Sequence, residues 1–130
     1  MKRAVGKTFF TEKGRLWREG LIVNYVEEGE WLYYNDSGKI EAKLTFLDGR
    51  VCGSYSEYFS SGQLKEQGKF VVVKEKNPKY RKDEKTVEYG NDKYLINSVK
   101  DGEWKYFHET GKLSKRELFD KGQLIKAEIL

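Results

Sequence analysis

Several residue types that commonly carry structure or chemistry are nearly missing from this chain of 130 residues. Its one cysteine, Cys52, excludes an intramolecular disulfide and a cysteine-rich zinc site. Its one histidine, His108, leaves too few imidazole ligands for a typical transition-metal site. We therefore expect no metal and no cofactor.

Long hydrophobic runs are also missing. The longest apolar runs hold four residues, such as Phe70 to Val73. A membrane-spanning helix needs about 20 apolar residues, so none is expected. Residues 1–8 carry charge but lack the apolar stretch of a signal peptide. These absences favour a cytoplasmic protein.

The charge is balanced and has no dense run of one sign. The 25 basic and 21 acidic residues alternate along the chain and leave a net charge of +4. This pattern is typical of a solvated surface and does not favour direct binding of nucleic acid. Aromatic residues make up 15% of the chain, enough to build a core where aliphatic residues are few. We expect a single folded domain over residues 1–130.

The most informative pattern is an internal repeat. Residues 29–40 recur at 53–64, which begin 24 residues later, and again at 102–113, with a partial copy at 9–16. A fixed period of this size is typical of a repeat architecture. We place the repeats near 5–28, 29–52, 53–76, 77–101 and 102–130, of which 77–101 is degenerate.

Each repeat has the pattern of a β-hairpin. Aromatic residues at 31–34 are followed by a turn cluster at 35–38, and residues 40–46 then alternate apolar with polar. Asp48-Gly49 is a second tight turn. The sequence therefore predicts an all-β protein, an elongated antiparallel β-meander built from repeated β-hairpins with little or no helix. We expect about ten or eleven strands and a body on the order of 50 Å long.

One segment interrupts the repeat. Gly53 and Gly102 are separated by 49 residues, which is two periods plus one. Within residues 74–100 we predict short strands at 80–82, 86–89 and 94–98. The part from Lys74 to Lys85 holds six basic and three acidic residues. It is either a recognition loop or a solvated hairpin.

The aromatic residues fall on two faces of the expected sheet. One column is uniform in size and is expected to be core: Phe10, Tyr34, Tyr58 and Phe107. The other face is less uniform, and exposed Trp and Tyr residues often dominate protein interfaces. We therefore take this face as the candidate partner-binding surface, extended by two residues of the irregular segment: Trp31, Tyr33, Tyr55, Trp104 and Tyr106, with Tyr80 and Arg81. The alternative is that the tryptophans only fill the second face of the sheet.

Catalytic residues are not evident. His108 falls in a polar turn, and Cys52 is expected to be a small buried filler. The carboxylates are scattered, and the repeat geometry brings no pair obviously together. Most glycines already have a turn or register role, so no phosphate-binding loop is indicated. We predict that the protein is not an enzyme.

The repeated pattern Gly-x-Trp-x-x-Tyr, followed by Gly-Lys-Ile, Gly-Gln-Leu or Gly-Lys-Leu, resembles the variant form of the MORN repeat. Three copies carry it, each in five positions: Gly29, Trp31, Tyr34, Gly38 and Ile40; Gly53, Tyr55, Tyr58, Gly62 and Leu64; Gly102, Trp104, Phe107, Gly111 and Leu113. The resemblance covers about two thirds of the chain, while residues 74–100 and Val5 depart from it.

The resemblance implies both a fold and a class of function. In bacteria such repeats occur in proteins similar to YwqK-type antitoxins. The implied function is a non-catalytic protein-binding module, an inhibitor, antitoxin or immunity protein that blocks a toxin, nuclease or other effector by covering its surface. The alternative is a scaffold of the MORN type associated with an anionic membrane or lipid.

Overall fold

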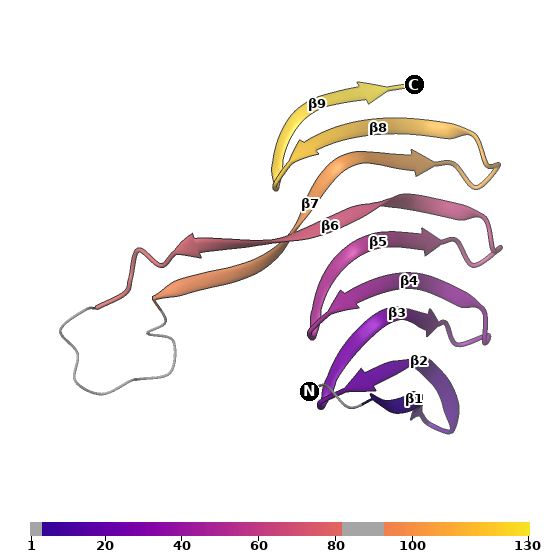
Figure 1. Cartoon of the computed structure of the whole chain (residues 1–130). Coiled ribbons are helices and arrows are strands. Elements are labelled where there is room, and N and C mark those ends of the chain that lie inside the picture. The colour runs from indigo at the N-terminus through magenta and orange to yellow at the C-terminus, as the bar shows by residue number, and fades with distance from the viewer. Residues whose placement is uncertain (1–3, 82–92) are drawn as a thin grey trace.

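The protein is a single antiparallel sheet whose strands follow one another in chain order (Figure 1). The computed structural model describes residues 4–81 and 93–130, and this part of the chain contains no helix. The strands in the described ranges are β1 (Ala4–Glu12), β2 (Arg15–Val23), β3 (Val26–Tyr34), β4 (Ile40–Leu47), β5 (Arg50–Tyr58), β6 (Leu64–Lys76), β7 (Tyr94–Phe107), β8 (Leu113–Asp120) and β9 (Gln123–Ile129). The predicted all-β meander of hairpins is confirmed.

The irregular segment forms an arm. The long strands β6 and β7 pair with each other from Glu66 to Lys76. The end of β6 and the start of β7 extend away from the stack of hairpins (Figure 1). The predicted strand at 94–98 is confirmed as the start of β7. Tyr80 and Arg81 do not lie in a strand, and residues 82 and 86–89 lie outside the described residues. The described sheet therefore has nine strands, fewer than the number expected from the period.

Two kinds of turn alternate along the chain. The two-residue turns have positive φ at both central residues, as in Asp48-Gly49 and Lys121-Gly122, which matches the twist of the flanking strands. The repeat turns are longer and share one hydrogen-bond pattern. The Asn35 amide donates to the Lys39 carbonyl at 2.9 Å, and the His108 amide donates to the Lys112 carbonyl at 2.8 Å. His108 is an exposed turn residue, as predicted.

A β-bulge recurs in each hairpin and bends the strands. The register skips one residue on the second strand of each pair, at Trp17, Glu41, Lys65 and Ser114. A bulge bends its strand and increases the local twist, and the strands in Figure 1 are visibly curved. Strands two apart are thereby brought close on one side of the sheet. There the Ser98 hydroxyl of β7 donates to the Val51 carbonyl of β5 at 2.7 Å.

The core lies on the face that carries Trp31, Tyr55 and Trp104, which we call the inner face. Both tryptophans are 0% exposed. Trp31 packs edge-on against Phe46, and Trp104 packs in the same way against Phe70. Complete burial in a single-layer sheet requires the sheet to curl around these rings, because side chains splay apart on the outside of a curve. The inner face is therefore the structural centre of the protein.

The expectation that the uniform column forms the core is wrong. Tyr34, Tyr58 and Phe107 are only half-buried, and the Tyr34 hydroxyl donates to a carboxylate oxygen of Glu19. Phe10 does not belong to that column. It pairs with Arg18 just before the bulge of its hairpin, as Tyr33 pairs with Ala42 just before the bulge of the next repeat, so Phe10 is equivalent to Tyr33 and not to Tyr34. Phe10 is displaced from the column because the two-residue turn Lys13-Gly14 makes the first hairpin shorter than the others.

Two glycines provide the space that the tryptophans need. A Cβ at Gly20 would lie 2.2 Å from Trp31, and a Cβ at Gly68 would lie 2.2 Å from Trp104. At the corresponding place in the middle of the sheet, Leu44 faces the smaller ring of Tyr55. Gly20 and Gly68 are not turn residues. Each stands at a register shift of its strand pair and provides the space for an indole ring.

Candidate binding site on the inner face

A groove crosses the inner face at the middle of the sheet. Its volume is about 270 Å³, and residues of β4 to β7 line it: Leu44, Val51, Tyr55, Glu66, Phe70, Ser98, Lys100 and Trp104. Three rings form its floor. The Tyr55 and Phe70 centroids are 5.4 Å apart, and the Tyr55 and Trp104 centroids are 5.6 Å apart. The groove thus has an apolar floor with a carboxylate and an ammonium group at its side.

A pair of carboxylates stands beside this floor. Glu57 of β5 and Glu66 of β6 are direct cross-strand partners. Burial, a hydrogen bond to Glu57 and the charge of Glu57 raise the pKa of Glu66 to about 7. The hydrogen bond from Glu66, followed by the charge of Lys65, lowers the pKa of Glu57. The two side chains therefore share one proton near neutral pH.

The sequence-based view that no carboxylates pair is wrong. The signal that reveals this pair is the hairpin register. The turn 59–63 and the bulge at Lys65 set Glu57 opposite Glu66, just as the equivalent turn sets Tyr106 opposite Lys115. The period alone aligns the copies with one another, but it does not say which residues face each other across a hairpin.

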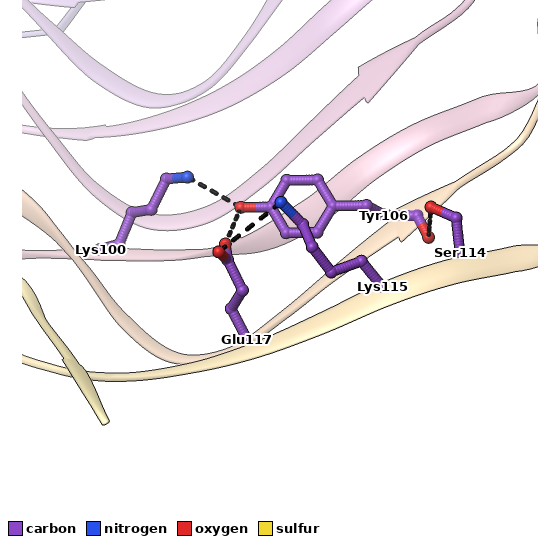
Figure 2. A network of polar contacts seen from close by, with 5 residues as sticks. All are labelled: Lys100, Tyr106, Ser114, Lys115 and Glu117. Atoms are coloured by element: carbon purple, nitrogen blue, oxygen red, sulfur yellow. Dashed lines mark hydrogen bonds and ion pairs between the residues drawn. The ribbon is translucent and has the colours of Figure 1, made fainter. Parts of the chain in front are cut away.

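A polar network borders the groove (Figure 2). The Tyr106 hydroxyl donates to Glu117 Oε1 at 2.6 Å and accepts from Lys100 Nζ at 2.9 Å. Lys115 Nζ lies 3.6 Å from Glu117 Oε2, and the Ser114 hydroxyl donates to the Tyr106 carbonyl. Burial and the bond to Glu117 raise the pKa of Tyr106 above its ordinary range. The network holds this tyrosine as a neutral, oriented hydroxyl.

Each buried tryptophan is covered by a cation. Lys100 Nζ lies 4.5 Å from the Trp104 ring centre, and the Arg18 guanidinium carbon lies 4.7 Å from that of Trp31. Arg18 also lies 4.4 Å from the Phe10 ring and binds Glu27 at 3.0 Å. Cations over aromatic faces are stabilised by the ring quadrupole.

The two tryptophan sites are related by an exchange of charge. Glu27 lies four residues before Trp31, and Lys100 lies four residues before Trp104. Arg18 lies two residues before Gly20, and Glu66 lies two residues before Gly68. The first site therefore takes its cation from β2 and its carboxylate from β3. The second takes its carboxylate from β6 and its cation from β7. The repeat period thus preserves the positions of the charged residues but exchanges their signs, so the two tryptophan sites do not carry the same charge pattern.

The residues predicted to bind a partner divide into three groups. Trp31 and Trp104 are completely buried, so the expectation that they are exposed is wrong, and the alternative that they fill the sheet's face is right. Three tyrosines are half-buried on the inner face: Tyr33, Tyr55 and Tyr106. Tyr80 and Arg81 are exposed but follow β6 at the far end of the arm, away from the groove.

The remaining reactive side chains do not gather at the groove. Cys52 is half-buried and not the fully buried filler that we expected. No group of three His, Cys, Asp or Glu side chains in the described part of the chain is placed to hold a metal ion. In the same ranges, no helix is of the length and apolarity that a membrane span requires.

Comparison with known families identifies the repeat. The profile of the MORN repeat variant matches residues 27–48, 51–71 and 100–121, which together make up half of the chain. The chain belongs to the MORN repeat variant family. Neither the curated proteins nor the solved structures gave a significant match.

The MORN matches coincide with hairpins of the sheet. Residues 27–48 cover β3 and β4, residues 51–71 begin in β5 and continue into β6, and residues 100–121 cover the end of β7 and all of β8. Each match brings large rings to the inner face, among them Trp31, Tyr55 and Trp104, in turn. The MORN repeats therefore build the floor on which the groove rests, and the expectation of a MORN-variant array of hairpins is confirmed.

Proposed function

We propose that the protein is a non-catalytic protein-binding module that holds its partner on the inner face, and that it acts as an inhibitor of the antitoxin or immunity type. The observation that carries the proposal is the groove between β4 and β7, where an aromatic floor is bordered by Glu66 and Lys100. Apolar contact there would supply affinity, and the charges at its side would orient the partner.

The tyrosines of the inner face support binding of a protein. Tyr33, Tyr55 and Tyr106 present half-buried rings whose hydroxyls are already held by neighbouring side chains, such as Arg18, Glu57 and Glu117. Tyrosine gives a large contact area at low entropic cost, and such residues are common at the centres of interfaces. Because the sheet fixes these side chains before binding, little ordering cost remains.

The opposite, outer face supports the choice of the inner one. Its central row runs through Lys43, Ser56, Gln67, Lys105 and Arg116, which are cross-strand partners in successive hairpins. This row is polar and resembles an ordinary solvated surface. Farther along, the same row reaches Leu32 of β3 and the exposed Phe9 of β1. Over β4 to β8, behind the groove, a partner that needs apolar contact therefore finds it on the inner face.

Non-catalytic action is part of the proposal. The carboxylate pair Glu57 and Glu66 stands beside the groove, and its groups are engaged with each other and with Tyr55. His108 is exposed in the repeat turn that follows β7 and does not line the groove. The double variant His108→Ala, Cys52→Ser is therefore expected to fold and to retain the full biological effect of the parent.

The test uses bulky substitutions on the two faces. Ser98 is exposed and lines the groove, whereas Ser54 is exposed on the outer face, where it bonds Thr45. The immobilised chain should capture a partner from its host, and the activity of that partner should fall as the chain is added in equimolar amounts. Ser98→Trp should abolish capture and inhibition. Ser54→Trp, which adds the same ring and also loses a hydroxyl bond, should leave both unchanged.

Other results would contradict the proposal. Equal capture by both variants would place binding outside the groove. A captured partner whose activity is unaffected would contradict the inhibitor function while leaving the binding module intact. Binding of vesicles with anionic lipids that is lost at moderate salt, in place of a protein partner, would favour the lipid scaffold.

A further inference from the structure

The last strand of the sheet leaves one edge open. β9 is paired with β8 on one side, and in the described sheet no strand lies on its other side. All of its side chains are exposed, including Ile125 at 55% and Ile129 at 76%. An exposed apolar edge strand is a template for pairing with another strand.

The backbone of Ala127 faces this open edge. The Leu130 amide donates to the Ser114 carbonyl of β8 at 2.9 Å. Hydrogen-bonding direction alternates along an antiparallel strand, so the amide and carbonyl of Ala127 and Ile129 point away from β8. These groups are available to a strand added beyond β9.

The sequence around Ala127 is symmetric. Residues 124–130 read Leu-Ile-Lys-Ala-Glu-Ile-Leu, which is the same in both directions except that Lys126 and Glu128 carry opposite charges. The pairing with β8 skips Ile125 between Leu124 and Lys126, so the regular part of the strand spans residues 126–129. When two such strands run antiparallel and are centred on Ala127, the two Ala127 residues lie opposite each other. In the same register Lys126 lies opposite Glu128, twice, by symmetry. Cross-strand pairs of this kind are stabilising.

We propose that the open edge of β9 binds the same edge of a second copy of this chain, which joins the two sheets through a two-fold axis at Ala127. The facing Ala127 side chains would lie on the inner face, which Ala127 shares with its partner Glu117. The Lys126–Glu128 pairs would lie on the outer face, where Glu128 already stands opposite Arg116. A shift of register by one residue would set Lys126 against Ala127 or Ile129, so the charge pattern selects one alignment.

The first test is the mass of the full chain in solution across a dilution series. Light scattering or sedimentation should show twice the chain mass of 15.3 kDa, falling toward the single-chain mass on dilution. Ala127→Pro should abolish the dimer and leave the fold intact, because the amide that it removes faces the open edge and not β8. A single-chain mass at the highest soluble concentration would refute the proposal.

The second test checks the register. Lys126→Glu or Glu128→Lys alone would set like charges opposite each other at both symmetric positions and should weaken the dimer by about tenfold. The double variant Lys126→Glu, Glu128→Lys should restore it, and mixing the two single variants should give a mixed dimer. If the double variant is as weak as the single ones, or if neither these changes nor Ala127→Pro affects the mass, another surface joins the copies and the proposal fails. Ser98→Trp in the groove should not change the mass, which separates this test from that of the proposed function.

Discussion

The seat of Trp104 gives the sharpest test of how this sheet is built. In Gly68→Ala the new Cβ would lie 2.2 Å from Cδ2 and 2.3 Å from Cε2 of the indole, whereas carbon atoms in contact normally lie about 3.5–4.0 Å apart. The indole has little room to retreat. Phe70 and Tyr55 pack against it, and its Nε1 donates to the Lys69 carbonyl at 3.2 Å.

The expected loss follows from this clash. Overpacking a well-filled core typically costs 1–3 kcal/mol, and here the obstacle is a fixed ring, so we expect a loss of about 3 kcal/mol in the free energy of unfolding. For a domain of this size that loss lowers the Tm by about 10 °C. Urea unfolding at 25 °C, together with thermal melting followed by circular dichroism, measures both quantities.

The control is a glycine that has conformational strain but no neighbour. Gly62 has φ of 95°, and nothing lies within 4 Å of a Cβ placed there. Gly62→Ala should therefore cost only the strain of an L-residue at positive φ, about 1–2 kcal/mol. Gly68→Ala should cost more, although Gly68 itself has no such φ.

A double-mutant cycle decides the cause. The middle of the sheet already pairs a side chain, Leu44, with a tyrosine, Tyr55. In a Trp104→Tyr background the smaller ring should therefore accommodate Ala at position 68, and Gly68→Ala should then cost less than about 1 kcal/mol. An equal cost in both backgrounds, or a cost no greater than that of Gly62→Ala, would refute the claim that Gly68 exists to seat the indole.

Two further predictions concern the protonated carboxylate and the buried indoles. Because the folded-state pKa of Glu66 is about 7, above its ordinary value of 4.5, this group favours the folded state most at low pH, and that contribution is lost as the pH rises toward and through 7. Glu66→Gln, which keeps a donor for Glu57, should match the parent in urea unfolding at pH 5 and exceed it by about 1 kcal/mol at pH 8, after allowance for solvent screening; equal stability at pH 8 would argue against the shared proton. In acrylamide quenching, Trp17, which is 43% exposed, should account for most of the accessible emission, because Trp31 and Trp104 are 0% exposed. Trp17→Phe should therefore leave blue-shifted and poorly quenched fluorescence, and a Trp17→Phe protein quenched as readily as the parent would show that the other indoles reach water.

Much of the architecture follows from local residue patterns. Turn glycines recur at fixed distances from aromatic residues, and apolar residues alternate with polar ones in Ile40 to Phe46. Tight turns join antiparallel neighbours, so a chain of hairpins with short turns can hardly form anything but a meander. The MORN pattern is local for the same reason, because each copy is one hairpin. His108 in an exposed turn was predictable because turn residues are set by their immediate neighbours.

The identity of the core was not predictable from the period. Alternation divides residues into two faces but does not say which face is buried, and a bulge reverses the alternation without a clear mark in the sequence. The uniform size of Tyr34, Tyr58 and Phe107 suggested that their face forms the core, whereas Gly20 and Gly68 indicate that the opposite face is buried. A glycine inside a strand pattern, away from any turn, marks a close approach to the backbone, and the positions of Gly20 and Gly68 gave that signal in the sequence.

The sequence by itself determined the all-β class, the hairpin unit, the antiparallel order and the absence of a disulfide, because each depends on residues close together in the chain. Only the tertiary structure decided that Trp31 and Trp104 are buried, that Glu57 meets Glu66, and that Arg18 and Lys100 cover opposite ends of one aromatic face. These facts depend on register and curvature. Both arise from bulges whose geometry is fixed when neighbouring strands pair, and a one-residue shift in pairing would exchange every inner side chain with an outer one.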